Sequence, residues 1–292
     1  MQAIPPQNRQ IVADLHCHST ASDGALSPSE LVARAFEKGV TLLALTDHDT
    51  CDGWHEAKAA ADGVGIDLLP GIELSCVWKN QTVHIVGLGF EATSPVMAEA
   101  VSRQQRSRAE RAEIIAQKLE KRGAPPILEA AIRCAGGGVP GRPHFARALV
   151  EAGVVGREDH AFKRWLGNGK PGDVRAYWPE MPTVIDWIRD AGGIAVLAHP
   201  RKYGLSATKL RALLYAFREA GGEGLEVLTG GQSPGDTPFL AKLCQDNDLY
   251  ASTGSDFHQP NRPWTELGSL PPLPKSVTPV WERLAMRVPQ GE

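Results

Sequence analysis

Short apolar runs alternate with longer amphipathic segments along most of the chain. Seven such runs lie at residues 11–16, 42–47, 66–73, 83–88, 194–199, 224–228 and 249–256. Runs rich in Leu, Ile and Val that are bounded by Gly, Pro or Asp are typical of buried parallel strands. Several of them end in a cluster of polar or ionisable residues. We therefore predict seven strands whose ends carry chemically active side chains.

Helical patterns follow most of these strands. Ser27-Pro28-Ser29-Glu30 supplies a helix N-cap and an N1 proline, and the pattern that it opens closes on Gly39. Comparable patterns cover residues 53–62, 182–191, 206–220 and 236–247. Repeated strand–helix alternation predicts an α/β barrel or a doubly wound sheet.

The alternation is interrupted between residues 91 and 175. Ser94-Pro95 opens a long helix that continues to Gly123, and shorter helical segments follow near 126–135, 144–152 and 158–166. We interpret this region as a helical insertion into the barrel. The expected organisation is a discontinuous barrel at 11–90 plus 176–270, a helical insertion at 91–175 that covers the active site, and a C-terminal tail at 271–292.

Composition narrows the class of protein. The chain has 292 residues, of which 42% are hydrophobic, and a formal net charge of −3. This apolar content excludes intrinsic disorder, and no run approaches the roughly 18 apolar residues of a membrane span. A small negative charge argues against a protein that mainly wraps duplex nucleic acid. Length alone allows two domains, but a single α/β barrel commonly needs about 250 residues.

Cysteine usage indicates a reducing compartment. The five cysteines are odd in number and widely spaced, with no CxxC pair, which argues against a disulfide framework or a cysteine-based zinc site. The N-terminal segment lacks a positive region followed by an apolar run, so no signal peptide is predicted. We therefore expect a cytoplasmic protein.

Histidine and carboxylate residues gather at the predicted strand ends. His16 and His18 are two apart on a predicted strand and would point to one face, with Cys17 on the other and Asp23 in the following loop. HxH alone is equally compatible with a hydrogen-bonded pair of histidines. Further candidates at strand ends are His48, Asp49, Glu73, His84, His199, Asp256 and His258.

These groups would meet at one rim, because the carboxyl ends of parallel strands converge in α/β folds. So many ionisable groups would be costly to pack together unless they coordinate cations. Mixed imidazole and carboxylate ligands suit Zn, Mn or Fe and favour catalytic over structural sites. The sequence therefore predicts a multinuclear metal-dependent hydrolase.

The runs DLHCHSTASDG, TDHDT, GIELS, HIVGLG, AHP and GSDFH, in this order, resemble the polymerase-and-histidinol-phosphatase (PHP) domain family. The resemblance covers about residues 11–90 and 193–260. Gly141-Arg142-Pro143-His144 is similar to a GRPH element of one bacterial branch, which includes a 3′,5′-nucleoside bisphosphate phosphatase and a 5′→3′ exoribonuclease. The resemblance implies a distorted (β/α)7 barrel.

Three metal sites follow from the resemblance. The implied ligand sets are His16, His18, Glu73 and Asp256; Glu73, His84 and His199; and Asp23, His48 and His258. The implied activity is removal of the 3′-phosphate from nucleoside 3′,5′-bisphosphates such as adenosine 3′,5′-bisphosphate. We expect in-line attack by a metal-bridging hydroxide with no covalent protein intermediate.

Catalytic and substrate-binding roles are assigned to further side chains. Asp256, His48 and Asp49 are the catalytic candidates, and Asp49 is either a proton donor to the leaving group or only a turn or supporting residue. Cationic groups are needed to bind substrate phosphates, and arginine suits them because its planar fork binds bidentately. The candidates are Arg108, Arg142, His144 and Arg201, although Arg108 also fits a solvated helix face.

Other functions stay open at this stage. A 5′→3′ exoribonuclease acting on short RNA is the nearest alternative, and the weak net charge favours the smaller nucleotide substrate. Amide or ring hydrolysis and a non-catalytic metal-binding scaffold are the others, since a fold does not fix its chemistry. The arginines argue against the former and the complete ligand set against the latter.

Overall fold

A computed structural model describes residues 11–174 and 177–286. The segment searched for a signal peptide begins in residues 1–10, which lie outside the described residues, as do 175–176 and the last six positions of the predicted tail. The chain forms two compact units, one of residues 1–100 and 179–292 and one of residues 101–178. No helix among the described residues is long and apolar enough to cross a membrane.

The first unit is a seven-stranded, nearly closed barrel with strand order β1 to β7. Its strands are β1 (Ala13–Asp14), β2 (Leu42–Leu45), β3 (Asp67–Trp78), β4 (Gln81–Leu88), β5 (Ile194–Leu197), β6 (Gly224–Thr229) and β7 (Tyr250–Gly254). The Leu15 N–H donates to the Thr253 carbonyl at 3.0 Å, and Cys17 bridges Phe257, which brings the first and last strands together. The predicted α/β barrel is confirmed.

One strand runs against the prediction of a parallel sheet. β4 pairs antiparallel with both β3 and β5. The reason is a two-residue hairpin loop, in which Lys79 and Asn80 have φ of 46° and 62°. Such tight turns require positive φ at both central residues, and they join antiparallel strands. This hairpin was not predicted, because the apolar run expected to form the third strand ends at residue 73.

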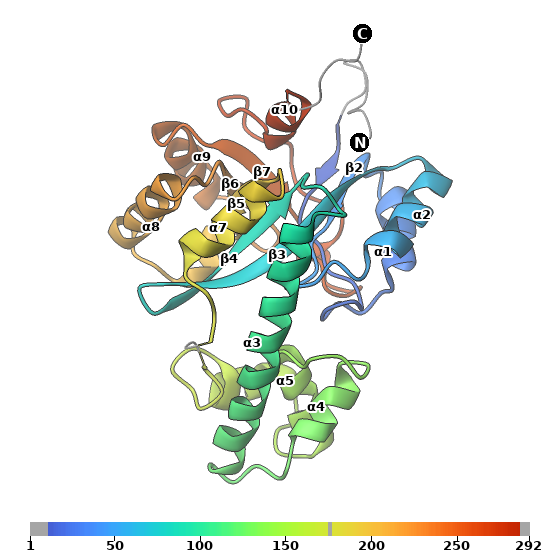
Figure 1. Ribbon diagram of the computed structural model, residues 1–292, viewed down its shortest axis with the longest axis vertical. Helices are drawn as coiled ribbons and strands as arrows, with labels where there is room; N and C mark the ends of the chain where they lie inside the picture. Colours follow the sequence, from blue (N-terminus) through green and yellow to red (C-terminus); the bar gives the residue numbers. More distant parts are fainter. Residues whose placement is uncertain (1–10, 175–176, 287–292) are drawn as a thin grey trace. The chain divides into compact units, whose positions relative to one another are not determined.

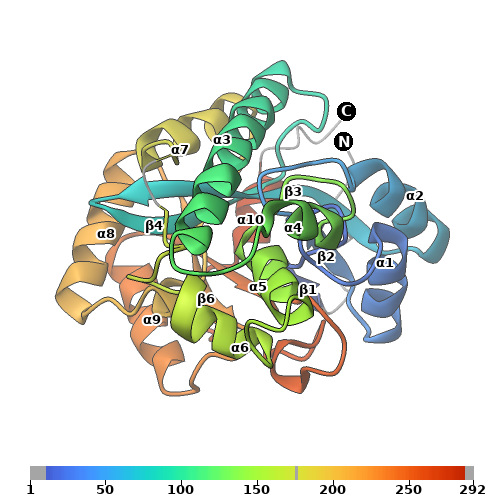
Figure 2. The ribbon, with the colours of Figure 1, turned by 90° about the horizontal axis from the view of Figure 1, so that it is seen from below.

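Helices surround the sheet on its outer side (Figure 2). They are α1 (Pro28–Glu37), α2 (Trp54–Val64), α7 (Met181–Asp190), α8 (Ala207–Glu219) and α9 (Asp236–Asp246), and they match the predicted helices. α1 begins as predicted, because Ser27 and Glu30 form a reciprocal capping box. These helices bury apolar side chains against the barrel and leave its carboxyl rim to the connecting loops.

The interior of the barrel is closed at one end by α10 (Val280–Ala285), which lies beside β7 in Figure 1. Val280 and Leu284 are buried in one apolar cluster with Leu15, Val86 and Val196. Part of the segment predicted as a tail is thus packed structure. This core supports the strands whose ends carry the histidines.

The second unit is helical. It contains most of α3 (Pro95–Glu120), together with α4 (Leu128–Cys134), α5 (Arg142–Glu151), α6 (Glu158–Ala161) and the π-helical turn η1 (Phe162–Leu166). Ile115, Leu119, Phe145 and Leu149 are fully buried in its own apolar cluster. The predicted helices of the insertion are therefore present.

Candidate metal centre

His16 and His18 lie just beyond the first strand. β1 covers only Ala13–Asp14, so the prediction that both histidines belong to a strand was wrong. Their ring centroids are nevertheless 5.1 Å apart, while Cys17 packs in a separate apolar cluster. A Cβ on Gly254 would lie 2.2 Å from the His16 Cβ, so glycine lets β7 approach this segment closely.

Glu73 lies at the centre of the cluster. It was predicted at a strand end, but it stands in the middle of β3, fully buried. Its Oε1 lies 2.8 Å from His84 Nδ1 and 2.9 Å from His199 Nε2. Its Oε2 faces three other imidazoles, those of His48 at 2.9 Å, His16 at 3.2 Å and His18 at 3.3 Å. One carboxylate therefore joins two groups of histidines.

The reversed direction of β4 explains why His84 joins this cluster. His84 is near the start of the predicted run 83–88, which in a parallel strand would place it toward the opposite end of the barrel; in the structure it lies in the middle of β4. Because β4 is antiparallel, Ser75 pairs with His84, and Glu73 lies diagonally across from it on the same face. The hairpin therefore delivers a carboxylate and an imidazole to the rim together.

Two aspartates complete the cluster. Asp256 Oδ1 lies 3.3 Å from His18 Nε2 and 3.6 Å from His16 Nε2. Asp256 and His258 were predicted to share a strand face, but β7 ends at Gly254 and Asp256 has a φ of 53°, so they occupy a loop. Asp23 Oδ1 lies 3.4 Å from His258 Nε2, and Asp23 Oδ2 lies 3.9 Å from His48 Nε2.

Several buried polar atoms of this cluster have no hydrogen-bond partner among the described residues. They are Nε2 of His16, both ring nitrogens of His18, Nδ1 of His48, Nδ1 of His199 and Oε2 of Glu73. Buried polar groups are costly when they are left unsatisfied. Four groups of three or four side chains bring their ligand atoms within 4.8 Å of one another. The cluster thus fits divalent metal ions, because imidazole nitrogens and carboxylate oxygens are suitable ligands for them.

Electrostatic coupling within the cluster is strong. Burial alone would raise the pKa of Glu73, but the neighbouring His48, His16 and His84 hold it well below its usual value. Burial opposes a charged His18, yet the neighbouring carboxylates of Asp256 and Glu73 raise its pKa to about 10. Burial lowers the pKa of His48 and of His199. Cation binding would therefore compete with protons held by some of these imidazoles.

Glu226 supports the cluster from behind. It is fully buried, its Oε1 lies 2.5 Å from Nδ1 of His16, and its Oε2 accepts from the backbone N–H of His199 at 2.5 Å. A β-bulge between Glu226 and Leu228 re-aims the strand at this point.

Asp49 occupies a buried position beside β3. Its Oδ1 accepts from the Ser75 N–H at 2.7 Å, and its Oδ2 accepts from the Ser75 hydroxyl at 2.9 Å. These bonds tie the loop after β2 to the strand that carries Glu73. They support the role of a residue that holds its neighbours in place, and proton donation by Asp49 stays a prediction.

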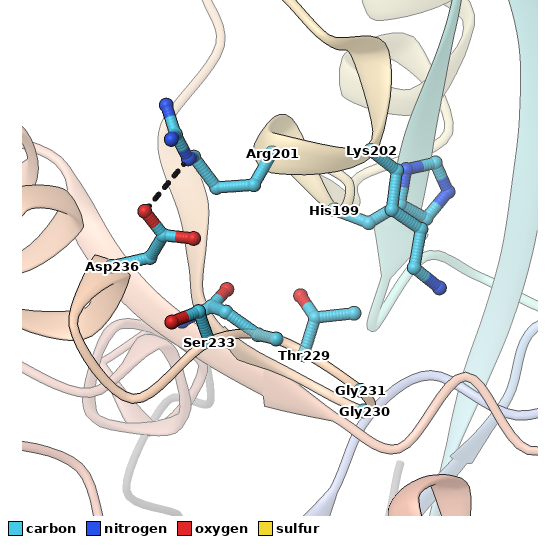
Figure 3. A pocket seen from close by; sticks show the side chains of 9 residues that line it. His199, Arg201, Lys202, Thr229, Gly230, Gly231, Ser233 and Asp236 are labelled. Atoms are coloured by element: carbon cyan, nitrogen blue, oxygen red, sulfur yellow. Dashed lines mark ion pairs between the residues drawn. The ribbon is translucent and has the colours of Figure 1, made fainter.

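The phosphate-binding candidates occupy both units. Arg201, in the 3-10 turn η2 (Pro200–Tyr203), pairs with Asp236 at 2.9 Å and lines a pocket that also includes His199 and Lys202 (Figure 3). The others belong to the helical unit. The guanidinium of Arg108 lies 5.6 Å from the ring centroid of Trp178, and that of Arg142 donates to the Leu166 carbonyl at 3.4 Å.

His144 is buried at the start of α5. Its Nδ1 accepts from the Gly141 N–H at 2.9 Å, so the imidazole, at the third helical position, reaches back to the N-cap residue as the N3 side chain of a capping box does. A contribution of His144 to substrate binding stays a prediction. The local contact shows that the residue also stabilises the Gly141–Arg142 turn.

A barrel whose rim gathers imidazoles and carboxylates around one glutamate defines a class, the metal-dependent phosphoester hydrolases. A sequence profile of the PHP domain matches residues 14–122. The chain belongs to the PHP domain family.

Relatives over nearly the full length support this assignment. The chain is 47% identical over 270 residues to a 5′-3′ exoribonuclease of Haemophilus influenzae, covering 92% of this chain and 98% of the relative. It is 46% identical over 277 residues to the 5′-3′ exoribonuclease Rnm of Escherichia coli, covering 94% of each. It is 41% identical over 276 residues to a 3′,5′-nucleoside bisphosphate phosphatase of Chromobacterium violaceum, covering 94% and 97%.

Solved structures agree in fold. A Chromobacterium violaceum protein described as an amidohydrolase, with bound sulfate and no metal, is 41% identical with a TM-score of 0.88, covering 94% of this chain and 96% of that one. A candidate metal-dependent phosphoesterase from Bifidobacterium adolescentis is 29% identical with a TM-score of 0.77, covering 95% and 97%.

Proposed function

We propose that this protein removes the 3′-phosphate from nucleoside 3′,5′-bisphosphates, converting adenosine 3′,5′-bisphosphate to AMP. The observation that carries the proposal is the position of His199, which belongs both to the histidine cluster and to a pocket containing Arg201 and Lys202. Phosphate-binding cations thus adjoin the groups suited to hold metal ions. The Chromobacterium relative named for this activity is 41% identical.

Two to three divalent ions, Mn, Zn or Fe, would occupy three ligand sets: His16, His18, Glu73 and Asp256; Glu73, His84 and His199; and Asp23, His48 and His258. The grouping of His16, His18 and Asp256 supports the first set, and that of Asp23, His48 and His258 supports the third. In the second set His84 and His199 both approach Oε1 of Glu73, but His84 also groups with His48, and His199 with His16. Oε2 of Glu73 faces the first set and Oε1 the second, so that carboxylate would bridge them. His18 lies close enough to belong to the third set as well.

The chemistry follows from charge. Bound divalent ions supply a deprotonated water near neutral pH and neutralise phosphoryl oxygens. In the overall reaction the oxygen of water forms a bond to phosphorus, the P–O3′ bond breaks, and the 3′-oxygen leaves with a proton. Lys202, which pairs with Asp256, and Arg201 would hold phosphate charge beside the cluster. His48 and Asp256 position the reacting groups, and the proton donor is Asp49 or water.

A second candidate is 5′→3′ exoribonuclease activity on short RNA. Three relatives of 47%, 46% and 43% identity carry that name. The two activities break the same type of bond, since releasing a 5′-terminal nucleotide as a 5′-monophosphate also cleaves P–O3′.

We infer a cytoplasmic location from the five free cysteines.

The discriminating experiment compares two substrates. Manganese-loaded protein is incubated with adenosine 3′,5′-bisphosphate and, separately, with short 5′-phosphorylated RNA, and initial rates of phosphate and mononucleotide release are measured. Faster phosphate release from the bisphosphate supports the phosphatase. Faster mononucleotide release from RNA contradicts the phosphatase proposal and supports the exoribonuclease activity. An Asp256→Asn variant is the control for contaminating activity, because it removes a ligand common to both reactions.

A further inference from the structure

An exposed tryptophan stands beside the pocket that contains Arg201. Trp264, in the 3-10 turn η3 (Pro263–Thr265), leaves 61% of its surface exposed. The Gly231 N–H donates to its carbonyl at 2.7 Å, and Gly231 is one of the residues that line the pocket. The backbone of Trp264 is therefore tied to the pocket wall, while the residue itself is largely exposed.

Glycine at position 231 brings the indole against the wall. Gly231 has a φ of 73°, a conformation that other residues rarely adopt. A Cβ at this position would lie 3.4 Å from Cδ1 of Trp264. The neighbouring Gly230 also has no room for a side chain, because its Cβ would lie 1.9 Å from the Ser255 carbonyl oxygen. The loop after β6 thus has two residues without side chains, Gly230 and Gly231, beside the Trp264 ring.

The lining of the pocket is polar and cationic, and Trp264 adjoins it at the lining residue Gly231. His199, Arg201 and Lys202 belong to the loop after β5, and Thr229, Gly230 and Gly231 belong to the loop after β6 (Figure 3). The former loop carries cations and a cluster histidine, and the latter contacts the indole. A nucleotide combines the complementary groups, because its phosphates are anionic and its base is flat and apolar on both faces.

We propose that Trp264 stacks on the nucleobase of the substrate while Arg201 and Lys202 hold the non-reacting phosphate. This inference rests on the proposed function and names the nucleoside part of its substrate site. Stacking accepts any base, since every base has a π-face. The protein should therefore discriminate weakly among adenine, guanine, cytosine and uracil.

Isolated exposed aromatic residues are common on protein surfaces and need no function. Tyr215 provides the comparison, because it is 65% exposed and lies on the outer helix α8, which contributes no residue to the pocket, whereas Trp264 contacts the lining residue Gly231. A Tyr215→Ala variant removes an aromatic surface of similar exposure. It should leave nucleotide binding unchanged.

The first test measures kinetics. Trp264→Ala should raise the KM for adenosine 3′,5′-bisphosphate about tenfold, as expected for a lost base–aromatic stack. In Trp264→Phe the KM for adenosine 3′,5′-bisphosphate should return most of the way to the value of the parent protein. The KM for an abasic sugar 3,5-bisphosphate should not change in either variant. An equal KM for the nucleotide in Trp264→Ala and in the parent protein would overturn the proposal, as would an equal rise for the abasic substrate.

The second test does not depend on turnover. AMP is titrated into the protein while tryptophan fluorescence is followed, with Trp264→Phe as the reference. Quenching that is lost in Trp264→Phe but retained in Tyr215→Ala supports stacking. Identical quenching in all three proteins overturns it. If the bisphosphate is not hydrolysed, the proposed function fails, yet this titration still decides whether Trp264 contacts a base.

Discussion

The carboxylate of Glu226 holds His16 and His199 at the same time. Its Oε1 lies 2.5 Å from Nδ1 of His16, and its Oε2 accepts from the His199 backbone N–H at 2.5 Å. With its Nδ1 proton donated to Glu226, His16 turns the lone pair of Nε2 toward Glu73 and Asp256. The second bond holds His199, whose φ of 27° is unusual for a residue with a side chain.

Replacing Glu226 by Gln should weaken metal binding about 10–100-fold. The amide keeps one acceptor but turns an NH2 group toward the second donor, so either His16 or His199 loses its partner. Calorimetric titration of the chelator-treated protein with Mn²⁺ measures the change. Glu223→Gln is the matched control, because Glu223 precedes β6 and pairs with Arg283 instead. Unchanged metal affinity in Glu226→Gln would refute the role.

Asp23→Asn should remove one metal ion and leave the others. Asp23 lies nearest to the third proposed set, 3.4 Å from His258 and 3.9 Å from His48, with His18 of the first set at 4.0 Å. The bound metal measured by mass spectrometry should fall by about one equivalent, with activity reduced. Asp52→Asn serves as the control, since Asp52 is exposed on the loop that follows His48. Full metal content in Asp23→Asn would argue for fewer sites than three.

Arg142→Ala should lower kcat/KM while metal content stays intact. Arg142 opens α5 in the helical unit and contributes a guanidinium that suits phosphate. Arg157→Ala is the comparison, because the Arg157 side chain is 73% exposed and pairs with Asp159 in the same unit. Steady-state kinetics on the bisphosphate give the result. Equal kcat/KM values in the two variants would exclude Arg142 from substrate binding.

The stability of the barrel should depend on pH through Glu266. Arg34 binds it bidentately, Nε to Oε1 at 2.9 Å and a terminal nitrogen to Oε2 at 2.6 Å, which lowers the pKa of Glu266 below its ordinary 4.5. The ion pair stabilises the fold above that value and is lost as the pH falls through the lowered pKa. Glu266→Gln should therefore cost about 1 kcal/mol at pH 7 and almost nothing at pH 3.

Urea unfolding at the two pH values measures this difference. Asp248→Asn provides the comparison, because the Asp248 side chain is 81% exposed and its pair with Arg218 should contribute little. A cost for Glu266→Gln that does not change with pH would show that the ion pair is not its source.

The seven strands and the outer helices could be predicted because their signals are local. Leu42–Leu45 and Ile194–Leu197 are compact apolar runs, and Ser27 with Glu30 marks a helix start without tertiary information. The direction of β4 could not be predicted in this way. It depends on a Lys79–Asn80 turn without glycine, whose positive φ values are set by the pairing of the flanking strands.

The cluster itself was visible from residue types, but its geometry was not. His16, His18 and Glu73 were selected because ligand-type residues fall near strand ends. Their distances depend on chain segments that meet only when the barrel closes, such as Gly254 against His16. Trp264 could not be predicted as a site residue, because no periodicity or spacing in the sequence distinguishes an exposed tryptophan beside a pocket from one elsewhere on the surface.

The β3–β4 hairpin has a consequence for the order of folding. Glu73 and His84 belong to one hairpin with a two-residue turn, so their contact closes a short loop at a small cost in chain entropy. Asp256 is instead separated from His16 by most of the sequence, and contacts between distant residues form more slowly. The half of the cluster around the hairpin should thus form early in folding. Binding of the full set of metal ions should occur only after β7 has paired with β1, so the rate of metal binding during refolding should measure that late step.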